Sequence, residues 1–388
     1  MGKKIKLLYI SQATGGVQRH VISVLSKINR DVFDIAGICP PQDLISGVSE
    51  GKESFLEAFK RIGVRAYPVV MSREINPVSD IKSFLKVYDI IKRERFDIVH
   101  AHSSKAGVLG RIAGRLAGIP AVVYTPHSFP FDRPRRMLLS RSLYAAIEKF
   151  AGFFCDKVIA VSEGEKELAV RSGVLPARKI IVIENAVEPV VLNIDSVKKR
   201  KEAGVGPEDR VIIFVGRMAP QKAPLDLVSA AEKACRIFPD AKFLLLGDGP
   251  LCKKISALIK EKGLSGSVLF LGWRNDAREL IAASDIFILP SLWEGCNYSL
   301  LDAVAMGKPV ITTDVAGVKG VVEDGVNGFI IPKGRPDLLS EAIIKMLKMS
   351  RGRLEEMGNN SMAMARKRIP PEGVAKDLEK LYLELIKR

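Results

Sequence analysis

The stretch VIIFVGRMAPQKAPLDLVSAAEKACRIFPDAKFLLLGDGP, residues 211–250, decides the fold class. It begins with an apolar run at 211–216, passes through a loop into an amphipathic segment after Pro224, and ends in a second apolar run at 242–247. Short apolar runs bounded by glycine and proline are typical of buried strands, and the segment between them has the spacing of a helix. This alternation predicts a parallel sheet with helices between its strands.

The same alternation continues on both sides of this stretch. Four further apolar runs follow it, at 268–272, 285–290, 309–313 and 328–332. Seven precede it, at 5–10, 33–39, 64–70, 96–102, 121–126, 157–162 and 179–187. The residues between the two sets, 188–210, are polar and contain Pro189 and Pro207. We therefore expect two α/β domains with doubly wound parallel sheets.

The polar interruption sets the expected domain boundary. We place an N-terminal domain at 1–188 and a C-terminal domain at 189–372, with an amphipathic helix at 373–388 that is long enough to pack back on the first domain. Ligands of such sheets bind beyond the carboxyl ends of the strands. We therefore expect the binding site in a cleft between the two domains.

The composition restricts the class of protein. Of the 388 residues, 47% are hydrophobic and 27% charged, which excludes a disordered chain. Five cysteines without a close pair indicate free thiols in a reducing cytoplasm. The chain shows neither a signal-peptide core nor an apolar run of membrane-spanning length. A net charge of +16 favours polyanionic partners, namely nucleic acid, an anionic membrane or phosphorylated ligands.

Two of the four histidines, His100 and His102, stand two residues apart on an expected strand and so face the same side of the sheet. A metal site needs a third ligand, and no candidate lies nearby in the sequence. We therefore expect a packed or pocket-lining pair and no metal ion.

Glycine-rich turns follow two of the expected strands. Gly15 and Gly16 lie between the first strand and the first helix, where backbone amides can approach a ligand, although an ordinary tight turn gives the same pattern. Gly247-Asp248-Gly249-Pro250 closes another strand. Asp248 is expected to cap a helix starting at Pro250, and Gly249 leaves room for a ligand.

A basic loop follows the strand at 211–216. It reads Gly216-Arg217-Met-Ala-Pro-Gln-Lys222, so two cations emerge from one loop five residues apart. The guanidinium fork of Arg217 and the point charge of Lys222 suit two adjoining phosphates, although a solvated basic loop has the same composition.

The segment PSLWEGCNYSLLDAVAMGKP at 290–309 carries the strongest signal. A strand ends at Pro290, a loop presents Glu294 and Gly295, and Asn297 is a good cap for the helix that follows. The first amides of that helix form an expected anion site for a diphosphate, at Tyr298, Ser299 and Leu300. Glu294 and Asp302 border the same helix end, where acids beside a phosphate are suited to accept hydrogen bonds from sugar or ribose hydroxyls.

Together these motifs resemble the retaining, nucleotide-sugar-dependent GT-B glycosyltransferases of family 4, which carry two acids separated by seven residues and serve bacterial polysaccharide and glycolipid biosynthesis. The resemblance implies two Rossmann-like domains facing across a cleft, with the acceptor bound by the first and the donor by the second. It implies that Arg217 and Lys222 hold the diphosphate, that Glu294 binds the sugar hydroxyls and that Asp302 binds the ribose. The histidine of Tyr124-Thr-Pro-His127-Ser-Phe matches a family histidine near the reacting centre.

The resemblance also sets expectations for the reaction. It implies transfer of a hexose from a UDP- or GDP-linked donor with retention of configuration and without a metal ion, with base contacts around Gly272-Trp273-Arg274. Two positions depart from the family pattern. Asp302 is one methylene shorter than the usual glutamate, and Ala186 replaces a glycine in Asn185-Ala186-Val187-Glu188. A non-catalytic sugar-binding relative and a nucleotide-sugar epimerase remain alternatives, because architecture does not fix the reaction.

The acceptor is suggested by a basic segment at 129–144. Apolar residues alternate there with four arginines, Arg133, Arg135, Arg136 and Arg141. Such alternation is typical of surface-binding amphipathic segments, although a core-packed helix with a basic edge is an equal alternative. We expect an anionic membrane surface, a lipid-linked acceptor and a peripheral location at the inner face of the cell membrane. Nucleic acid is disfavoured, because aromatics are only 6% and no recognition module is present.

Overall fold

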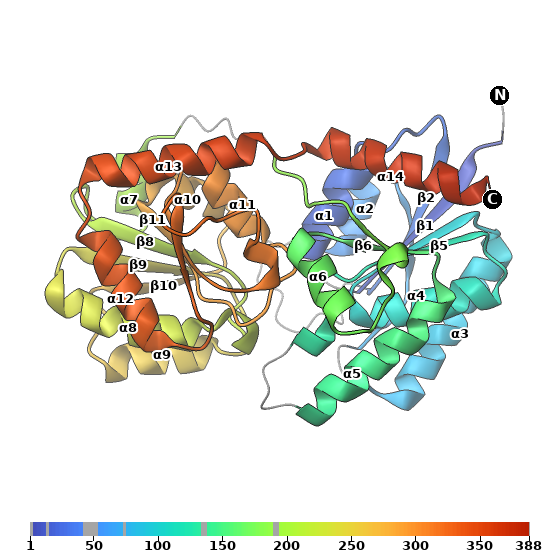
Figure 1. The fold of residues 1–388 in the computed structure, drawn as a ribbon, viewed down its shortest axis with the longest axis horizontal. Helices are drawn as coiled ribbons and strands as arrows, with labels where there is room; N and C mark the ends of the chain where they lie inside the picture. The colour runs from blue at the N-terminus through green and yellow to red at the C-terminus, as the bar shows by residue number, and fades with distance from the viewer. Residues whose placement is uncertain are drawn as a thin grey trace. The chain divides into compact units, whose positions relative to one another are not determined.

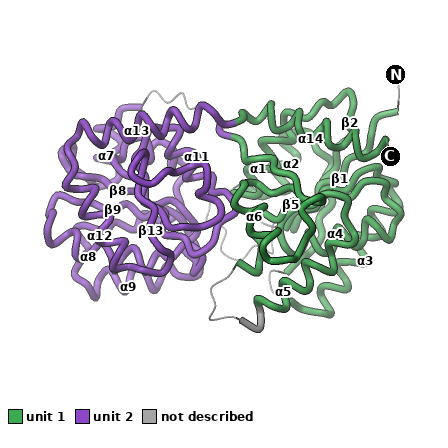
Figure 2. Tube along the Cα trace, in the orientation of Figure 1, with its two compact units in different colours: residues 1–186, 369–388 green, residues 187–368 purple. Residues whose placement is uncertain are grey.

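The computed structural model of the chain describes residues 3–12, 15–41, 53–72, 75–132, 138–188 and 194–387. The chain divides into two compact units, shown in Figure 2. Unit 1 comprises Met1–Ala186 and Ile369–Arg388, and unit 2 comprises Val187–Arg368. In each unit helices cover both faces of one parallel sheet (Figure 1), which confirms the expected α/β, GT-B-type fold.

The sheet of unit 1 has seven parallel strands in the order β3-β2-β1-β4-β5-β6-β7. Their bounds are Ile5–Ser11 (β1), Phe33–Cys39 (β2), Arg65–Pro68 (β3), Ile98–His102 (β4), Ala121–Thr125 (β5), Lys157–Ala160 (β6) and Ile180–Val182 (β7). The chain builds the sheet outward from β1 to β3 and then returns to the other side of β1 with β4. The carboxyl ends of β1 and β4 therefore flank the switch point at which such sheets bind ligands.

Two sets of helices bury the two faces of this sheet. One hydrophobic cluster lies under α1 (Gly16–Leu25), α2 (Phe55–Arg61) and α14 (Pro371–Ile386). The other lies under α3 (Pro77–Glu94), α4 (Ser104–Leu116), α5 (Leu138–Ala151) and α6 (Glu163–Arg171). The strands read as near-continuous apolar runs because both faces of the sheet are covered.

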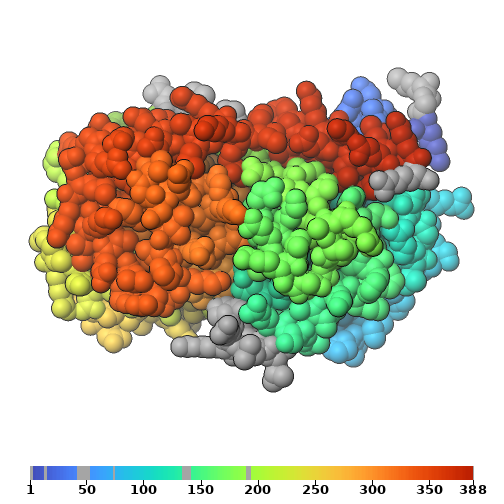
Figure 3. All heavy atoms as spheres, viewed as in Figure 1, coloured from blue at the N-terminus to red at the C-terminus, as the bar shows by residue number. Residues whose placement is uncertain are grey.

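The last helix, α14, is part of unit 1 although the whole of unit 2 precedes it in the chain. It starts with Pro371 in its first turn and buries one apolar stripe that includes Val374, Leu378 and Leu381. Its outer side forms part of the surface of unit 1, at the red end of the colour scale (Figure 3). Its Tyr382 hydroxyl lies 2.6 Å from the hydroxyl of Tyr9 on β1. The helix therefore completes the core of unit 1.

The sheet of unit 2 has six parallel strands in the order β10-β9-β8-β11-β12-β13. Their bounds are Arg210–Val215 (β8), Ala241–Leu246 (β9), Val268–Gly272 (β10), Ile286–Leu289 (β11), Val310–Thr313 (β12) and Gly328–Ile331 (β13). The helices are α7 (Ser196–Glu202), α8 (Pro224–Ile237), α9 (Cys252–Glu261), α10 (Ala277–Ala283), α11 (Tyr298–Ala305), α12 (Pro336–Leu347) and α13 (Arg351–Arg366). The switch point of this sheet lies between β8 and β11.

Two glycines of unit 2 let the loops after β8 and β9 cross. A Cβ on Gly247 would stand 1.9 Å from the carbonyl oxygen of Gly216, and one on Gly249 would stand 2.5 Å from that of Met218.

The expected start of a helix at Pro250 is wrong. Helix α9 begins at Cys252, and Asp248 instead accepts a hydrogen bond from the amide of Gly249 at 2.6 Å.

All five cysteines are free thiols. Within the described ranges, none of the helices combines the length and the apolar character that a membrane span requires.

Candidate functional site

The loops that leave β8 and β11 lie next to each other at the switch point of unit 2. The amide of Leu292 donates to the carbonyl oxygen of Gln221 at 2.7 Å, and the Gln221 side chain donates to the carbonyl oxygen of Trp293 at 2.9 Å. These two hydrogen bonds fix the short 3₁₀ turn Pro220–Lys222 against the loop that carries Glu294. A cation and an acid from distant parts of the sequence therefore meet at one place.

Lys222 and Glu294 form a buried ion pair at this point. The Lys222 ammonium donates to Oε1 of Glu294, and the two residues are only 9% and 7% exposed. The Ser291 hydroxyl donates to the same carboxylate oxygen at 2.7 Å, and the amide of Gly317 donates to the Glu294 carbonyl oxygen at 3.0 Å. Both side chains are thus held in fixed positions, which suits preorganised binding of a polar ligand.

The remaining residues of the basic loop differ in exposure. Arg217 is exposed, whereas Gly216 is half-buried beneath it. A Cβ on Gly216 would lie 3.1 Å from the Phe214 ring and 3.6 Å from the aliphatic stem of Lys222. The loop therefore carries an exposed arginine, Arg217, and a buried lysine, Lys222.

Helix α11 starts as the sequence predicts, but one of the three amides assigned to an anion site is already used. The Asn297 side chain accepts a hydrogen bond from the amide of Leu300 at 3.0 Å. The cap itself therefore satisfies that donor in this structure, and the role of Leu300 in an anion site stays a prediction. Tyr298 and Ser299 occupy the first two positions of the helix. Gly295 lies so close to Gly317 that a Cβ on the latter would stand 2.6 Å from the Gly295 carbonyl oxygen.

Asp302, the second acid, lies on α11 and is 5% exposed. Its Oδ1 lies 3.4 Å from Nε of Arg278 on α10, and Nη1 of the same arginine lies 3.4 Å from Glu188. The sequence did not single out Arg278. Residues 278 and 302 stand on different helices, and only the contact of α10 with α11 brings them together.

The base-binding expectation concerns the end of β10. Trp273 follows that strand and is half-buried. The Arg274 guanidinium is held by Asp276 through two hydrogen bonds of 2.7 and 2.8 Å, and these bonds hold the pKa of Asp276 well below its usual range. Arg274 is therefore fixed by its own loop.

In unit 1, the loop after β5 presents His127 in an unusual backbone conformation. His127 has φ of 55° and Ser128 has φ of 105°, values that are costly for residues other than glycine. The carboxylate of Glu165 secures this turn by accepting hydrogen bonds from the amides of Ser128 at 2.6 Å and Val161 at 2.8 Å. Burial raises the pKa of Glu165 to about 7.

The structure corrects the expectation that no third ligand accompanies His102. One ring nitrogen from each of His20, His102 and His127 lies within 4.8 Å of the others. Nδ1 of His102 and Nε2 of His127 are 3.0 Å apart. The three residues are 82 and 25 positions apart in sequence, but α1, β4 and the loop after β5 meet at the switch point of the sheet.

These imidazoles are neutral at physiological pH. Burial lowers the pKa of His20 to about 4, and burial together with the neighbouring histidines holds the pKa values of His102 and His127 well below their usual range. The fourth histidine, His100, has Tyr382 at 2.6 Å from Nδ1 and Thr125 at 2.8 Å from Nε2. His100 is therefore a fully bonded residue of the core.

The glycine turn after β1 begins α1. Gly16 is the first residue of the helix, and Gly15 caps it with φ of 72°, a conformation that favours glycine. A Cβ on Gly15 would meet no described atom within 4 Å, so the positive φ and not crowding is what favours glycine there.

The basic segment expected to meet a membrane is described only in part. Arg133, Arg135 and Arg136 lie outside the described residues. Arg141 is half-buried on α5, and the surface of the same helix carries Leu143 and Phe150, each more than half exposed.

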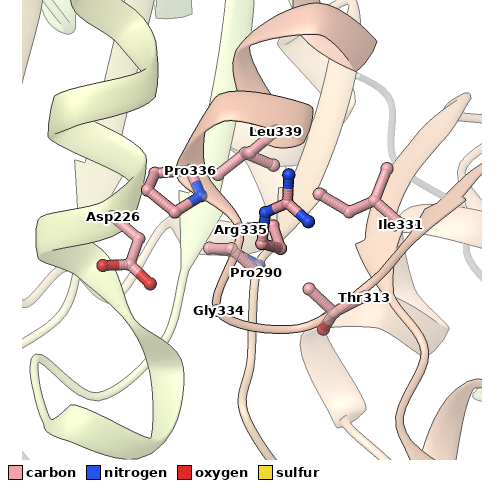
Figure 4. A pocket seen from close by; sticks show the side chains of 8 residues that line it. All are labelled: Asp226, Pro290, Thr313, Ile331, Gly334, Arg335, Pro336 and Leu339. Atoms are coloured by element: carbon pink, nitrogen blue, oxygen red, sulfur yellow. The ribbon is translucent and has the colours of Figure 1, made fainter.

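A small hollow lies in unit 2 near the carboxyl ends of β11, β12 and β13 (Figure 4). It is a shallow surface hollow with no enclosed cavity, and is lined by Asp226, Pro290, Thr313, Ile331, Gly334, Arg335, Pro336 and Leu339. Ligand pockets usually enclose about 300–1,000 Å³. The hollow contains none of the candidate donor residues, so we do not assign it to the donor.

Two families match the chain, one on each side of the division between the units. Residues 14–190 match "Glycosyltransferase Family 4", and residues 195–364 match "Glycosyl transferases group 1".

Individual relatives span most of the chain. The UDP-Gal:α-D-GlcNAc-diphosphoundecaprenol α-1,3-galactosyltransferase of Escherichia coli is 34% identical over 355 residues, covering 88% of each chain. The N,N'-diacetylbacillosaminyl-diphospho-undecaprenol α-1,3-N-acetylgalactosaminyltransferase of Campylobacter jejuni is 25% identical over 364 residues, covering 90% of this chain and 91% of its own. Among solved structures, HepE of Anabaena in complex with UDP-glucose has a TM-score of 0.80 at 22% identity, covering 98% of this chain and all of its own.

Proposed function

The chain belongs to the family 4 glycosyltransferases, and from this premise we propose that it transfers a hexose from a UDP-linked donor to a lipid-linked glycan with retention of configuration. The observation that carries the proposal is the buried pair of Lys222 and Glu294 at the switch point of unit 2. A relative that is 34% identical over 88% of the chain is named for a UDP-galactose donor, so UDP-galactose is the first donor to test.

In this proposal the donor diphosphate lies between Arg217 and Lys222, at the start of α11. Cleavage of the anomeric bond develops negative charge on the leaving phosphate and oxocarbenium character on the sugar. The fixed ammonium of Lys222 and the helix end stabilise the first charge without reorganisation. Glu294 accepts hydrogen bonds from sugar hydroxyls, and Asp302 accepts one from the ribose. The cations supply the stabilisation that a metal ion gives in other transferases.

The family resemblance implies retention, and the lack of a suitable nucleophile among the motifs bears on how retention is achieved. No carboxylate that the sequence singles out in the first domain fits a covalent intermediate, and His127 is held neutral by its burial. We therefore propose that the acceptor enters on the face from which the nucleotide leaves. NMR of the product distinguishes the outcomes, because an inverted anomeric centre would exclude this pathway.

The acceptor half of the proposal is a polyprenyl-diphosphate-linked sugar at an anionic membrane. Support comes from the names of the two curated relatives, both of which are diphosphoundecaprenol-directed. It also comes from α5, where Leu143 and Phe150 are exposed beside Lys149 and Arg141. Each basic side chain near anionic lipid contributes about 1 kcal/mol. The protein would then be a peripheral protein of the cytoplasmic membrane face.

The decisive experiment combines the purified chain with UDP-galactose, UDP-glucose, UDP-N-acetylglucosamine and GDP-mannose, and with a short polyprenyl diphosphate N-acetylglucosamine acceptor. Transfer of the sugar from one of these donors, with its anomeric configuration retained in the product, supports the proposal. Interconversion of the donor without acceptor would indicate an epimerase, and binding without turnover a non-catalytic relative. Liposomes test the membrane half: substitution of alanine for Arg133, Arg135, Arg136 and Arg141 is expected to abolish binding to anionic vesicles at low salt.

A further inference from the structure

The three-histidine cluster of unit 1 has the composition of a transition-metal site. His20, His102 and His127 come from α1, β4 and the loop after β5, and one ring nitrogen of each lies within 4.8 Å of the other two. Imidazole nitrogen is the donor that Zn²⁺, Ni²⁺ and Cu²⁺ accept most readily in proteins, and three histidines with an open fourth position form a known Zn²⁺ ligand set.

The distances are close to those of a coordinated ion. Zn²⁺ binds imidazole nitrogen at about 2.0–2.1 Å, so two nitrogens in a tetrahedral shell stand roughly 3.3–3.4 Å apart. Nδ1 of His102 and Nε2 of His127 are already 3.0 Å apart. The separations within the cluster reach up to 4.8 Å, so binding of an ion requires the three rings to move closer together.

His102 has one partnered and one unpartnered ring nitrogen. Its ring is fully buried, its Nδ1 lies 3.0 Å from Nε2 of His127, and its Nε2 has no hydrogen-bond partner among the residues that the structure describes. An imidazole gives one ion a single nitrogen, so an ion at Nδ1 takes the place of the contact with His127. His100, by contrast, has a partner on both ring nitrogens and offers no ligand atom.

His127 is the most exposed member of the cluster. It is half-buried, whereas His20 and His102 are buried. An ion from solution would therefore enter from the side of His127.

We propose that His20, His102 and His127 bind one Zn²⁺ ion, with water as its fourth ligand, and that the bound ion stops sugar transfer by occupying His127. The ion is an inhibitor here and not a cofactor. The binding half stands on the geometry of unit 1 alone. The inhibition half rests on the proposed function and on the expectation, from the family resemblance, that His127 acts near the reacting centre.

Binding is tested on the full chain after removal of metals with a chelator. Competition with a chromophoric chelator gives the stoichiometry and the dissociation constant for Zn²⁺, and Co²⁺ reports a four-coordinate nitrogen site by its visible absorption. We expect one equivalent per chain and thermal stabilisation that grows with Zn²⁺ concentration. His20→Ala and His102→Ala should weaken binding at least tenfold. Cys235→Ser is the matched control for adventitious thiol binding and should leave it unchanged.

The outcomes separate the two halves of the proposal. If the wild-type chain takes up no Zn²⁺, or if His20→Ala binds it as tightly as wild type, the site does not exist. His20 is buried on α1, so circular dichroism and urea denaturation of His20→Ala and His102→Ala show which variant is folded, and the folded variant decides the question. If Zn²⁺ binds at the histidines but transfer continues at saturation, inhibition is wrong while the site stands. A chain that binds Zn²⁺ yet shows no transfer in its metal-free form contradicts the proposed function and leaves the site intact.

Discussion

The ammonium of Lys222 donates a hydrogen bond to Oε1 of Glu294, and both side chains are almost fully buried where β8 and β11 end. Either charge alone would be costly at this depth, so the two side chains hold each other in place. In the proposed function Lys222 faces the leaving phosphate and Glu294 faces the sugar. In that proposal this one ion pair contacts both the diphosphate and the sugar, the two groups joined by the bond that is broken.

Glu294→Gln is expected to separate donor binding from transfer. The amide keeps the shape of the side chain but loses the charge that strengthens its hydrogen bonds to sugar hydroxyls, and a loss of about 2–3 kcal/mol corresponds to a roughly hundredfold fall in kcat/KM. UDP affinity should stay the same or rise, because an acid near the diphosphate is removed. Kinetics and calorimetry measure both. Glu232→Gln, at a carboxylate of α8 paired with Lys262, is the control and should behave as wild type. Full transfer activity in Glu294→Gln would contradict the assignment.

Asp302→Asn is expected to weaken UDP binding by about ten- to a hundredfold, equivalent to about 1.5–3 kcal/mol for a hydrogen bond to a charged group. Arg278, whose Nε lies 3.4 Å from Asp302, positions this carboxylate. Arg278→Ala should therefore weaken UDP binding less than Asp302→Asn does, and the double variant should be no worse than Asp302→Asn alone. Titration calorimetry with UDP measures each. Additive losses would show that Arg278 acts on the nucleotide by itself.

The sequence predicts correctly those features that depend on residues close together in the chain. The strands around 211–250 and the loop positions of Lys222 and Glu294 follow from apolar runs and glycine punctuation, and parallel strands necessarily bring their carboxyl ends to one edge of the sheet. The signal for the cap of α11 is also local, because Asn297 directly precedes the helix. The cap and the expected anion site overlap there, because both use the Leu300 amide.

Features that depend on the order of strands could not be read from the sequence. His20 and His102 meet because β4 pairs with β1, and His127 joins them because β5 pairs with β4. A search for ligands along the chain misses this cluster, since its members are far apart in sequence. Arg278 was missed for the same reason. Its contact with Asp302 requires the packing of α10 on α11, which no spacing within either helix reveals.

Arg111 and Glu148 form an ion pair inside unit 1 with exposed fractions of 0% and 1%, and Tyr124 donates to the same carboxylate at 3.0 Å. Glu148→Gln leaves the guanidinium of Arg111 without a counter-charge in the core. We expect a loss of about 3–5 kcal/mol in the free energy of unfolding, measured by urea denaturation. Asp89→Ala breaks an exposed pair with Arg93 and should cost less than about 1 kcal/mol. Equal losses in the free energy of unfolding for the two substitutions would show that burial does not increase the contribution of the Arg111–Glu148 pair to stability.

Glu165 makes the stability of unit 1 depend on pH. Its pKa in the folded chain is raised from 4.5 to about 7, so between these values the folded state holds a proton that the unfolded state has lost. The stabilising contribution is therefore complete below pH 4.5 and is lost as the pH rises through 7. A shift of this size corresponds to about 3 kcal/mol.

Glu165→Gln removes this titration, because an amide stays neutral. Urea denaturation at pH 5 and pH 8 should show a fall in stability with pH that is about 3 kcal/mol smaller in the variant than in wild type. The variant should also have a lower kcat, because an amide cannot accept hydrogen bonds from both Ser128 and Val161, and the turn that carries His127 is then less well fixed. Identical pH slopes in the two proteins would show that the carboxyl does not titrate in this range.

Tyr382 connects α14 to the centre of unit 1, since its hydroxyl lies 2.6 Å from both the Tyr9 hydroxyl and Nδ1 of His100. Tyr382→Phe keeps the ring but leaves two buried polar groups without a partner, at about 1–3 kcal/mol each. We expect a fall of about 2–5 kcal/mol in the free energy of unfolding, measured by urea denaturation of the full chain. Tyr88→Phe, at a half-buried tyrosine of α3, should change it by less than about 0.5 kcal/mol. If the two variants were equally stable, α14 would be held by its apolar stripe alone, and the hydroxyl network would contribute nothing to its attachment.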